Sequence, residues 1–245
     1  MKLLLVELAY LGDLLLTTPV IRALKQKFPH AILDVLASAY SAEILDGNPY
    51  IRTVWKWKRK KGLQDFWEWV RVLQRERYDA VFVLHRSARA VLWAYFAGIP
   101  ARYGFTTPMG RWLLTAHIPF RYDIHRVENH LRLFRRVYQT EFRDTQLDIF
   151  VPPRVEEEIQ HLLPKSEYVV VHPAGSWESK NWMPEGYAEV ADELKSTYGW
   201  EVVFTGTERD VKIVEGIMRR MRHRGQNLAG KTTVMQLAGV LAKAK

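Results

Sequence analysis

The stretch Lys2-Leu3-Leu4-Leu5-Val6-Glu7-Leu8, followed by Tyr10-Leu11-Gly12-Asp13, is one of the two most informative parts of this sequence. Its apolar residues predict a buried strand, and a helical pattern follows it. In the second half of the chain, the apolar strand Tyr168–Val171 runs into another loop of small, polar and charged residues, His172–Pro184. Open α/β sheets bind ligands at the carboxyl ends of their strands. The two stretches therefore predict a cleft enzyme with a carboxylate in its first half and a phosphate-binding loop in its second.

Strand and helix patterns alternate along the whole chain. Strands are predicted at Lys2–Leu8, Ala31–Ala37, Val54–Trp57, Ala80–Leu84, Tyr168–Val171, Glu201–Phe204 and near Asn227. Helices are predicted at Leu14–Lys27, Ser41–Leu45, Gln64–Glu76, Ala88–Ala97, Val127–Tyr138, Pro184–Tyr198, Glu208–Arg222 and Thr232–Lys243. This alternation predicts an α/β protein with parallel sheets and right-handed crossovers.

A hinge is predicted where Val151-Pro152-Pro153 precedes a charged helix, Arg154–Leu163. We expect an N-terminal domain over residues 1–150 and a C-terminal domain over residues 151–245. The second domain shows only three strand–helix units, and the chain stops within the last predicted helix. We therefore expect the C-terminal domain to be incomplete as written.

The composition excludes several classes of site. The 245 residues include no cysteine, which rules out disulfides, thiolate catalysis and cysteine-ligated metals. No apolar run reaches the roughly 20 residues that span a bilayer. The first strand contains Glu7 and lacks a cleavage-site pattern, so it does not read as a signal peptide. These features predict a cytoplasmic protein.

The net charge of +9 is concentrated in one segment. Residues 51–62 contain six lysines and arginines and no acid, and tryptophans are interleaved with them and follow them as far as Trp69. Such a segment suits nucleic acid, an anionic membrane surface or an acidic substrate, whereas a solvated loop beside packed tryptophans is the simpler interpretation. The number of aromatic residues favours an interfacial or acceptor-binding role.

Asp13 has two interpretations. A Gly-Asp pair at a strand-to-helix turn is typical of a helix N-cap. Alternatively, Gly12 allows a ligand to approach the backbone and Asp13 acts as a base. If Thr17-Thr18-Pro19 starts a new helix, we expect Asp13 to lie in a loop.

The loop His172–Pro184 is the stronger indication of a binding site. Ala174-Gly175-Ser176 offers backbone N–H groups and a hydroxyl to phosphate oxygens, and Lys180 adds a positive charge. An ordinary loop with one exposed lysine is the alternative. After the next strand, Glu208 or Asp210 suits a ribose hydroxyl or complements the dipole of the helix that follows.

Residues 225–232 match the P-loop pattern G-x-x-x-x-G-K-[ST]. A P-loop requires a buried strand directly before its first glycine. The residues before Gly225 are instead a basic helix end, so the pattern does not indicate an NTPase. It predicts a short strand at Asn227-Leu228, a turn at Gly230, and a helix capped by Thr232 or Thr233.

His85, Arg86 and Arg89 follow a predicted strand, and we expect them to line the cleft, although His85 by itself is more typical of a structural histidine. The eight histidines show no pairing that suits a metal, so no metal site is predicted.

Together these motifs resemble the ADP-heptose:lipopolysaccharide heptosyltransferases of glycosyltransferase family 9. The resemblance rests on Gly12-Asp13 with Thr17 and Pro19, on His172–Ser176 with Lys180, Trp182 and Pro184, and on Leu228–Thr232. It implies a GT-B fold: two Rossmann-like domains with parallel sheets and an interdomain cleft. The N-terminal domain would bind the acceptor and the C-terminal domain the nucleotide sugar. The family continues beyond the position of Lys245 with a segment that helps to hold the donor phosphates.

The resemblance also implies residue roles. Asp13 would be the general base, while Gly175, Ser176 and Lys180 would hold the ADP phosphates. Glu208 or Asp210 would bind the ribose, and Thr232 would lie near the adenosine. The residues expected at the acidic, phosphorylated acceptor are Gly12, Lys58, Arg59, Lys60 and Lys61.

The expected function is inverting heptose transfer from ADP-heptose to the inner core of lipopolysaccharide, without a metal or other cofactor. The partners would be the nucleotide sugar, an acidic phosphorylated glycolipid and the anionic inner face of the inner membrane. Two alternatives remain: a GT-B enzyme with another nucleotide sugar, and a protein that binds nucleic acid or an anionic surface through residues 51–69. The sequence lacks a recognised nucleic-acid fold motif.

Overall fold

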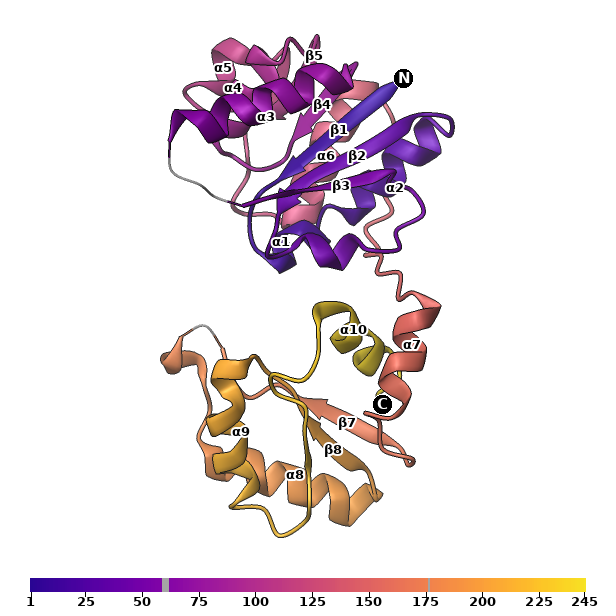
Figure 1. Cartoon of the computed structure of the whole chain (residues 1–245), viewed down its shortest axis with the longest axis vertical. Coiled ribbons are helices and arrows are strands. Elements are labelled where there is room, and N and C mark those ends of the chain that lie inside the picture. Colours follow the sequence, from indigo (N-terminus) through magenta and orange to yellow (C-terminus); the bar gives the residue numbers. More distant parts are fainter. Residues whose placement is uncertain (59–61, 176) are drawn as a thin grey trace. The chain divides into compact units, whose positions relative to one another are not determined.

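The computed structural model describes residues 1–58, 62–175 and 177–245. The chain divides into two compact units, Met1–Phe150 and Val151–Lys245 (Figure 1). Each unit consists of a parallel sheet covered by helices, as the alternation of strand and helix patterns predicted.

The N-terminal unit is built on a six-stranded sheet in the order β3-β2-β1-β4-β5-β6. Its strands are β1 (Lys2–Glu7), β2 (Ile32–Ser38), β3 (Thr53–Trp57), β4 (Ala80–Val83), β5 (Ala101–Phe105) and β6 (Ala116–Ile118). All neighbouring strands are parallel. The strand order reverses direction between β1 and β4, which is the point where doubly wound sheets bind ligands.

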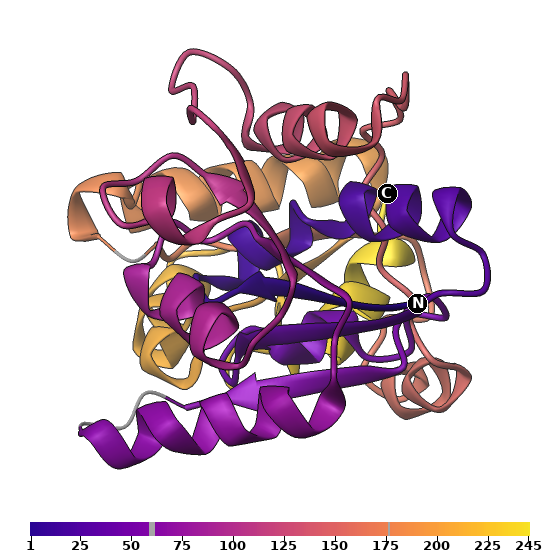
Figure 2. The same cartoon turned by 90° about the horizontal axis from the view of Figure 1, so that it is seen from above.

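Helices cover both faces of this sheet. They are α1 (Leu11–Leu15), α2 (Thr18–Lys27), η1 (Ala42–Leu45), α3 (Leu63–Glu76), α4 (Ala88–Phe96), α5 (Gly110–Leu113) and α6 (Arg126–Tyr138). Figure 2 shows α3 on one side of the strands and α2 and α6 on the other. Because both faces are buried, the central strand β1 carries no exposed residue, and Leu3, Leu4 and Leu5 are completely buried.

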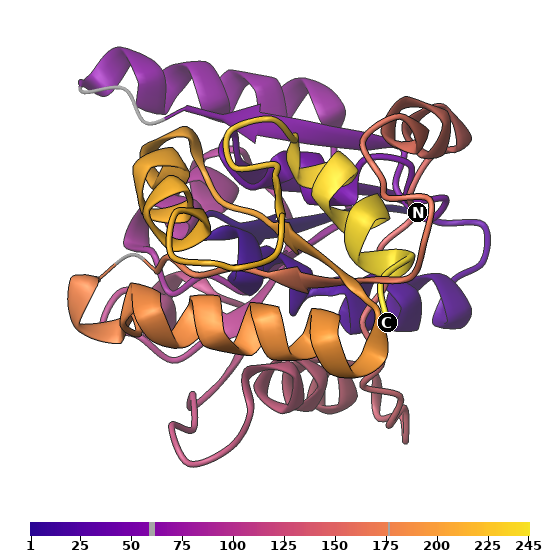
Figure 3. The ribbon, with the colours of Figure 1, turned by 90° about the horizontal axis from the view of Figure 1, so that it is seen from below.

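The C-terminal unit has a three-stranded parallel sheet in the order β7-β8-β9. The strands are β7 (Tyr168–Val171), β8 (Glu201–Phe204) and β9 (Gln226–Asn227), and the helices are α7 (Pro153–Gln160), η2 (Glu178–Lys180), α8 (Pro184–Tyr198), η3 (Glu208–Asp210), α9 (Val211–Met218) and α10 (Val234–Ala242). One core lies between the sheet and α7 and α10, and a second lies between the sheet and α8 and α9. Figure 3 shows α8 and α10 on opposite sides of β7 and β8.

The structure corrects two predictions of local structure. The helix predicted over Leu14–Lys27 is two helices, because the chain turns at Thr17, whose hydroxyl donates to the carbonyl of Leu14 at 2.7 Å, and α2 restarts with Pro19 in its first turn. The strands β5 and β6 were not predicted. They extend the sheet by two parallel strands beyond β4, and residues that follow them line part of the site described next.

Candidate functional site

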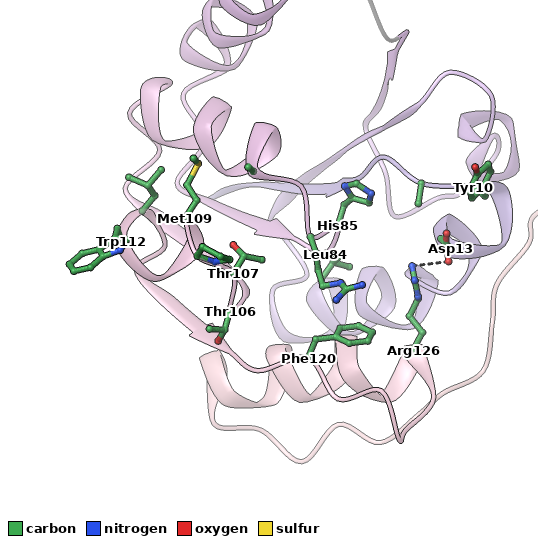
Figure 4. Close-up of a pocket in the computed structure, with 15 residues that line it drawn as sticks. Tyr10, Asp13, Leu84, His85, Thr106, Thr107, Met109, Trp112, Phe120 and Arg126 are labelled. Atoms are coloured by element: carbon green, nitrogen blue, oxygen red, sulfur yellow. Dashed lines mark ion pairs between the residues drawn. The ribbon is translucent and has the colours of Figure 1, made fainter.

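A pocket of about 1180 Å³ lies in the N-terminal unit, where the strand order changes direction. It is lined by the loops that follow β1, β4 and β5 together with the start of α6; its residues are Ala9, Tyr10, Asp13, Leu84, His85, Arg86, Ala88, Thr106, Thr107, Pro108, Met109, Trp112, Leu113, Phe120 and Arg126 (Figure 4). Met109 and Trp112 lie at one end of the pocket, and Asp13 and Arg126 lie at the other (Figure 4). A cavity of this size and mixed character suits a sugar with an attached polar or apolar group.

Asp13 lies at the charged side of this pocket, in the short helix α1. The residue is therefore helical, and the expectation of a loop is wrong even though the chain does restart at α2. Tyr10, not Asp13, occupies the N-cap position, and no side chain caps this helix. The Asp13 carboxylate instead forms an ion pair with Arg126, with 2.7 Å between Oδ1 and Nη1 (Figure 4).

Two titratable groups, the buried Glu7 and the half-buried His85, interact electrostatically with this ion pair. Glu7, the last residue of β1, is completely buried. Its Oε1 accepts a hydrogen bond from the backbone N–H of Ala9 at 3.1 Å, while Oε2 has no partner among the described residues. Burial raises the pKa of Glu7 to about 7, and the positive charge of Arg126 opposes that rise. Near neutral pH the buried carboxyl of Glu7 is therefore partly protonated.

His85 follows β4 and lines the pocket beside Leu84. Burial lowers the pKa of His85 below its usual 6.5, and the neighbouring Arg126 acts in the same direction. The imidazole is consequently neutral at pH 7. Arg86 also lines the pocket, and its guanidinium lies over the ring of Phe120 at 4.7 Å from the ring centre.

Three residues of this site, Glu7, Phe120 and Arg126, were not identified from the sequence. Glu7 looked like one polar residue inside an apolar strand. Phe120 and Arg126 reach the pocket from a segment far along the chain, and no local motif marks them. Of the arginines expected to line the site, Arg86 does so, whereas Arg89 forms an ion pair with the buried Asp65, with 3.3 Å between Nη1 and Oδ2.

The basic segment after β3 is only partly described. Gly12 and Lys58 are both exposed, and Arg59, Lys60 and Lys61 lie outside the described residues. Neither Gly12 nor Lys58 lines the pocket that contains Asp13.

The tryptophans of this region are mostly core residues, which corrects the expectation of an aromatic interface. Trp57 is buried, and its ring packs edge-on against Trp93 with 5.6 Å between ring centres. Trp55 and Trp69 pack against the same core. Trp67 is the exception, with 44% of its surface exposed. These rings are largely unavailable for stacking on nucleic-acid bases, which single-strand binding normally uses.

In the C-terminal unit, hydrogen bonds draw together the loops that follow the three strands. The ring nitrogen Nδ1 of His172, after β7, lies 3.1 Å from the hydroxyl of Thr205, after β8. The backbone N–H of Gly230, after β9, donates to the carbonyl of Gly206 at 2.9 Å. The residues predicted to bind the donor therefore share one edge of the sheet.

The loop after β7 places Gly175 and Lys180 near each other. The backbone N–H of Gly175 donates to Oδ1 of Asn181 at 2.8 Å, so that N–H group already has a partner. Lys180 ends the short helix η2 with its side chain exposed, and its ammonium has no partner in the described part of the chain. Ser176, the third residue of the predicted phosphate site, is outside the described residues.

The structure distinguishes the two acids predicted to bind the ribose. Oδ2 of Asp210 accepts hydrogen bonds from the backbone N–H and the hydroxyl of Thr207, each at 2.7 Å, and so completes a capping box. Glu208 is exposed, and no ion pair or hydrogen bond of its carboxylate is found among the described residues. Glu208 is therefore the acid available to a ligand.

The segment that matches the P-loop pattern has the predicted turn at Gly230 and helix cap at Thr233, and its strand, Gln226–Asn227, begins one residue before the predicted Asn227-Leu228. The ammonium of Lys231 donates to the carbonyl of Asn227 at 2.9 Å, within its own loop. Gly230 adopts a φ of +70°, and Thr233 caps α10 through a capping box with Gln236. Thr232 lies between this turn and the helix, half-buried.

Over the described ranges, no group of three or more His, Asp or Glu residues has a geometry that holds a metal ion. A search of the same ranges for a helix long and apolar enough to cross a membrane finds none.

Comparison with protein families gives one decisive match. Residues 66–245 match the model of glycosyltransferase family 9 (heptosyltransferase). The chain belongs to this family. It is accordingly a glycosyltransferase, as its motifs predicted.

Curated relatives of this glycosyltransferase cover nearly all of its length. It is 26% identical to lipopolysaccharide heptosyltransferase 2 of Salmonella typhimurium, over 100% of this chain and 76% of the relative. It is 28% identical to lipopolysaccharide heptosyltransferase 3 of Escherichia coli, over 95% of this chain and 72% of the relative.

Solved structures support the same fold. The structure of E. coli ADP-heptose LPS heptosyltransferase II matches with a TM-score of 0.83 and 25% identity, over 100% of this chain and 77% of that chain. A family 9 glycosyltransferase from Veillonella parvula matches with a TM-score of 0.88 and 21% identity, over 99% and 73% of the two chains. The glycosyltransferase therefore has the GT-B fold, with a Rossmann-like sheet in each unit.

Proposed function

We propose that this glycosyltransferase moves a heptose from ADP-heptose to the inner core of lipopolysaccharide, with inversion at the anomeric carbon and with Asp13 as the general base. The observation that carries the proposal is the position of Asp13, whose carboxylate lines the pocket at the switch point between β1 and β4. The names of the relatives supply the sugar and the acceptor class, and the related E. coli structure is named for ADP-heptose.

In the proposed reaction, an acceptor hydroxyl in the pocket gives its proton to Asp13 as its oxygen attacks the anomeric carbon. The new C–O bond forms while the bond between that carbon and the β-phosphate oxygen breaks, and ADP leaves with the electron pair. Direct displacement from the opposite face inverts the anomeric centre. A positioned base of this kind contributes about 10²–10⁴-fold to rate.

The donor would be held by the loops at the carboxyl edge of the C-terminal sheet. Lys180 would place its charge on the diphosphate beside Gly175 and Ser176, since an ammonium is a mobile point charge suited to phosphate. Glu208 would accept hydrogen bonds from the ribose hydroxyls, and Thr232 would lie near the adenosine. We propose that the leaving diphosphate is stabilised by these groups, without a metal ion.

The acceptor is proposed to be an acidic, phosphorylated glycolipid at the inner face of the inner membrane. Lys58 is exposed at the end of β3 and begins the basic segment that continues through Arg59, Lys60 and Lys61. Clustered basic residues are attracted to anionic headgroups at about 1 kcal/mol each. Gly12 is exposed beside Asp13, where a sugar can approach the backbone.

The decisive experiment supplies the chain with ADP-heptose, UDP-glucose or GDP-mannose and a truncated lipopolysaccharide acceptor. Mass spectrometry detects the added sugar, and NMR gives the configuration of the new glycosidic bond. Heptose transfer from ADP-heptose alone, with inversion, is the expected result. Transfer only from a UDP- or GDP-sugar would reject the donor, and a retained configuration would reject the direct displacement.

Calorimetric titrations with ADP, UDP and GDP test the donor site without the acceptor. We expect ADP to bind best. If UDP or GDP is preferred, the protein is a GT-B enzyme that uses another nucleotide sugar.

A further inference from the structure

Arg126 forms an ion pair with Asp13, and an acidic ligand can take the place of Asp13 in it. Arg126 is the first residue of α6, and its Nη1 lies 2.7 Å from Oδ1 of Asp13, as the dashed line in Figure 4 shows. The side chains keep 33% and 23% of their surface exposed, respectively. Because both side chains remain partly exposed, an anion that enters the pocket can reach the guanidinium of Arg126 and compete with Asp13 for it.

The guanidinium of Arg126 also has unused binding capacity. An arginine carries five N–H donors in a planar fork, which matches the two oxygens of a carboxylate or phosphate. Within the described residues, the ion pair with Asp13 is its one polar contact. The remaining donors are available to a molecule that enters the pocket.

The charges around the pocket favour an anion. Among the described residues that line the pocket, Arg86 and Arg126 are the cations and Asp13 is the one carboxylate. His85 is neutral at pH 7 because burial lowers its pKa, and burial raises the pKa of the nearby Glu7 to about 7, so that much of it is uncharged at neutral pH. Once Asp13 takes the proton of the acceptor hydroxyl, the pocket has two arginines and at most a partial negative charge on Glu7.

We propose that Arg126 binds an oxyanion of the acceptor, a carboxylate or a phosphate, directly beside the hydroxyl that reacts. This inference rests on the proposed function and deepens it. When the oxyanion binds the guanidinium of Arg126, part of the contact between Arg126 and Asp13 is lost. Oδ1 of Asp13 is then free to accept the hydroxyl proton. A neutral acceptor leaves the ion pair between Arg126 and Asp13 intact, so Arg126 selects acidic acceptors independently of the basic segment that begins at Lys58.

The transfer test compares Arg126→Gln and Arg126→Lys with the parent enzyme. Arg121→Gln is the matched control, because Arg121 is exposed, pairs with Asp123 and does not line the pocket. Hydrogen bonds to charged groups are worth about 1.5–3 kcal/mol, which corresponds to an increase of roughly 10- to 150-fold in KM for the acidic acceptor. We expect this increase with Arg126→Gln, a smaller one with Arg126→Lys, and no change with the control or in ADP affinity.

Modified acceptors identify the oxyanion. Truncated lipopolysaccharide is supplied untreated, methyl-esterified at its carboxylates, or dephosphorylated. The modification that removes the recognised group should raise the KM of the parent enzyme and leave the KM of Arg126→Gln unchanged. If the KM of Arg126→Gln exceeds that of the parent by the same factor with all three acceptors, Arg126 does not recognise an oxyanion and the inference is wrong.

Binding without transfer separates this inference from the proposed function. Ligand-observed NMR with glucuronate and its methyl ester, and with glucose 6-phosphate and glucose, reports binding in the absence of donor. The parent should bind one of the acidic sugars more strongly than its neutral partner, and Arg126→Gln should lose that preference. Loss of the preference supports the inference even if the parent transfers no heptose, whereas an equal preference in parent and variant overturns it.

Discussion

The two units of this glycosyltransferase hold their candidate groups in different ways. In the N-terminal unit, Asp13 forms an ion pair with Arg126, and the buried carboxyl of Glu7 interacts electrostatically with both residues. In the C-terminal unit, Lys180 and Glu208 are exposed at the edge of the sheet, and neither side chain has a partner in the described ranges. The charged groups of the first site already contact one another, whereas Lys180 and Glu208 of the second site would gain partners when a ligand binds.

This difference follows from the chemistry proposed for each unit. A base contributes to rate only if it is placed within hydrogen-bond reach of the proton it removes, and groups that stabilise a transition state work best when they are already oriented. Residues that hold a nucleotide gain their contacts when it binds, and their exposure before binding has little effect on the free energy of the protein. Each of the following substitutions tests one side of this contrast.

Asp13→Asn should have the largest effect. The amide cannot take up the acceptor proton, so kcat should fall by about 10²–10⁴-fold. ADP affinity should stay within roughly twofold of the parent, because the predicted nucleotide contacts belong to the other unit. Single-turnover assays with ADP-heptose measure the rate, and calorimetry measures the affinity.

Asp123→Asn is the control for this substitution, since Asp123 forms an exposed ion pair with Arg121 near the start of α6. The control should retain full activity. If Asp13→Asn unfolds the protein, or if it keeps more than a tenth of the parent kcat, Asp13 is a structural residue and the contrast between the units disappears.

Glu7→Gln should stabilise the protein at alkaline pH by roughly 3 kcal/mol, the free energy that corresponds to a pKa change from 4.5 to about 7. Because the pKa is raised in the folded state, the stabilisation from the protonated carboxyl is complete below pH 4.5 and is lost as the pH rises through about 7. Glutamine is uncharged and keeps an oxygen for the N–H of Ala9, so the variant does not suffer this loss.

Urea unfolding of Glu7→Gln and the parent at pH 4.5, 6 and 8 measures the effect. The variant should match the parent at pH 4.5 and exceed it at pH 8. Burial lowers the pKa of His130 to about 4, which acts in the opposite direction, but His130 is present in both proteins and its effect cancels in the comparison. A constant difference at all three pH values would show that folding does not raise the pKa of Glu7.

Much of the fold follows from local sequence patterns, and the missed strands show the limit of such patterns. The strand β5 contains Arg102, whose guanidinium donates to backbone carbonyls near the ends of neighbouring elements, at 2.6 Å for both Ile99 and Leu113. It also contains Gly104, where an added Cβ would lie 3.0 Å from the carbonyl oxygen of Val83. A charged residue and a glycine interrupt the apolar run, although the folded sheet needs both.

The candidate site likewise contains residues that the local sequence predicts and residues that it does not predict. Asp13 could be predicted because a strand, a turn and a helix beside it form one continuous stretch. Arg126 could not, because only the packing of α6 against the sheet brings it to Asp13. The role of Trp57 was misjudged for a related reason: a tryptophan in a basic segment has the same local sequence whether its ring faces solvent or packs on Trp93, as it does here.

Lys180→Ala tests the exposed side of the contrast. Removing one ammonium from a diphosphate should raise the Kd for ADP by roughly 10- to 100-fold, since a hydrogen bond to a charged group is worth about 1.5–3 kcal/mol. Stability should not change, because Lys180 is exposed. Lys165→Ala is the control: it is an exposed lysine that precedes β7, at the opposite edge of the sheet. An unchanged Kd for ADP in Lys180→Ala would remove this residue from the proposed donor site.

Asp192→Asn should have the smallest effect, and its pH dependence should be opposite to that of Glu7→Gln. Asp192 is a buried carboxylate of α8, but its oxygens accept hydrogen bonds from the backbone N–H groups of Arg222 and His223, each at 2.8 Å. Burial alone would raise the pKa of Asp192, yet these N–H groups hold it below the usual 3.8. The stabilisation is therefore present at neutral pH and is lost as the pH falls below 3.8 through the folded-state value.

Asp192→Asn should cost about 1–2 kcal/mol at pH 7, because asparagine keeps only one acceptor oxygen and turns its NH2 group toward a backbone N–H that the second carboxylate oxygen accepts from in the parent. The difference from the parent should shrink as the pH approaches 3. Thermal unfolding at pH 3, 5 and 7 measures it. The two buried carboxyls would then differ in their partners: Glu7 has one backbone N–H and a proton, whereas Asp192 has a charge, two backbone N–H groups and the guanidinium of Arg222 at 3.4 Å. If both variants instead shift stability in the same direction with pH, burial rather than hydrogen bonding controls both groups.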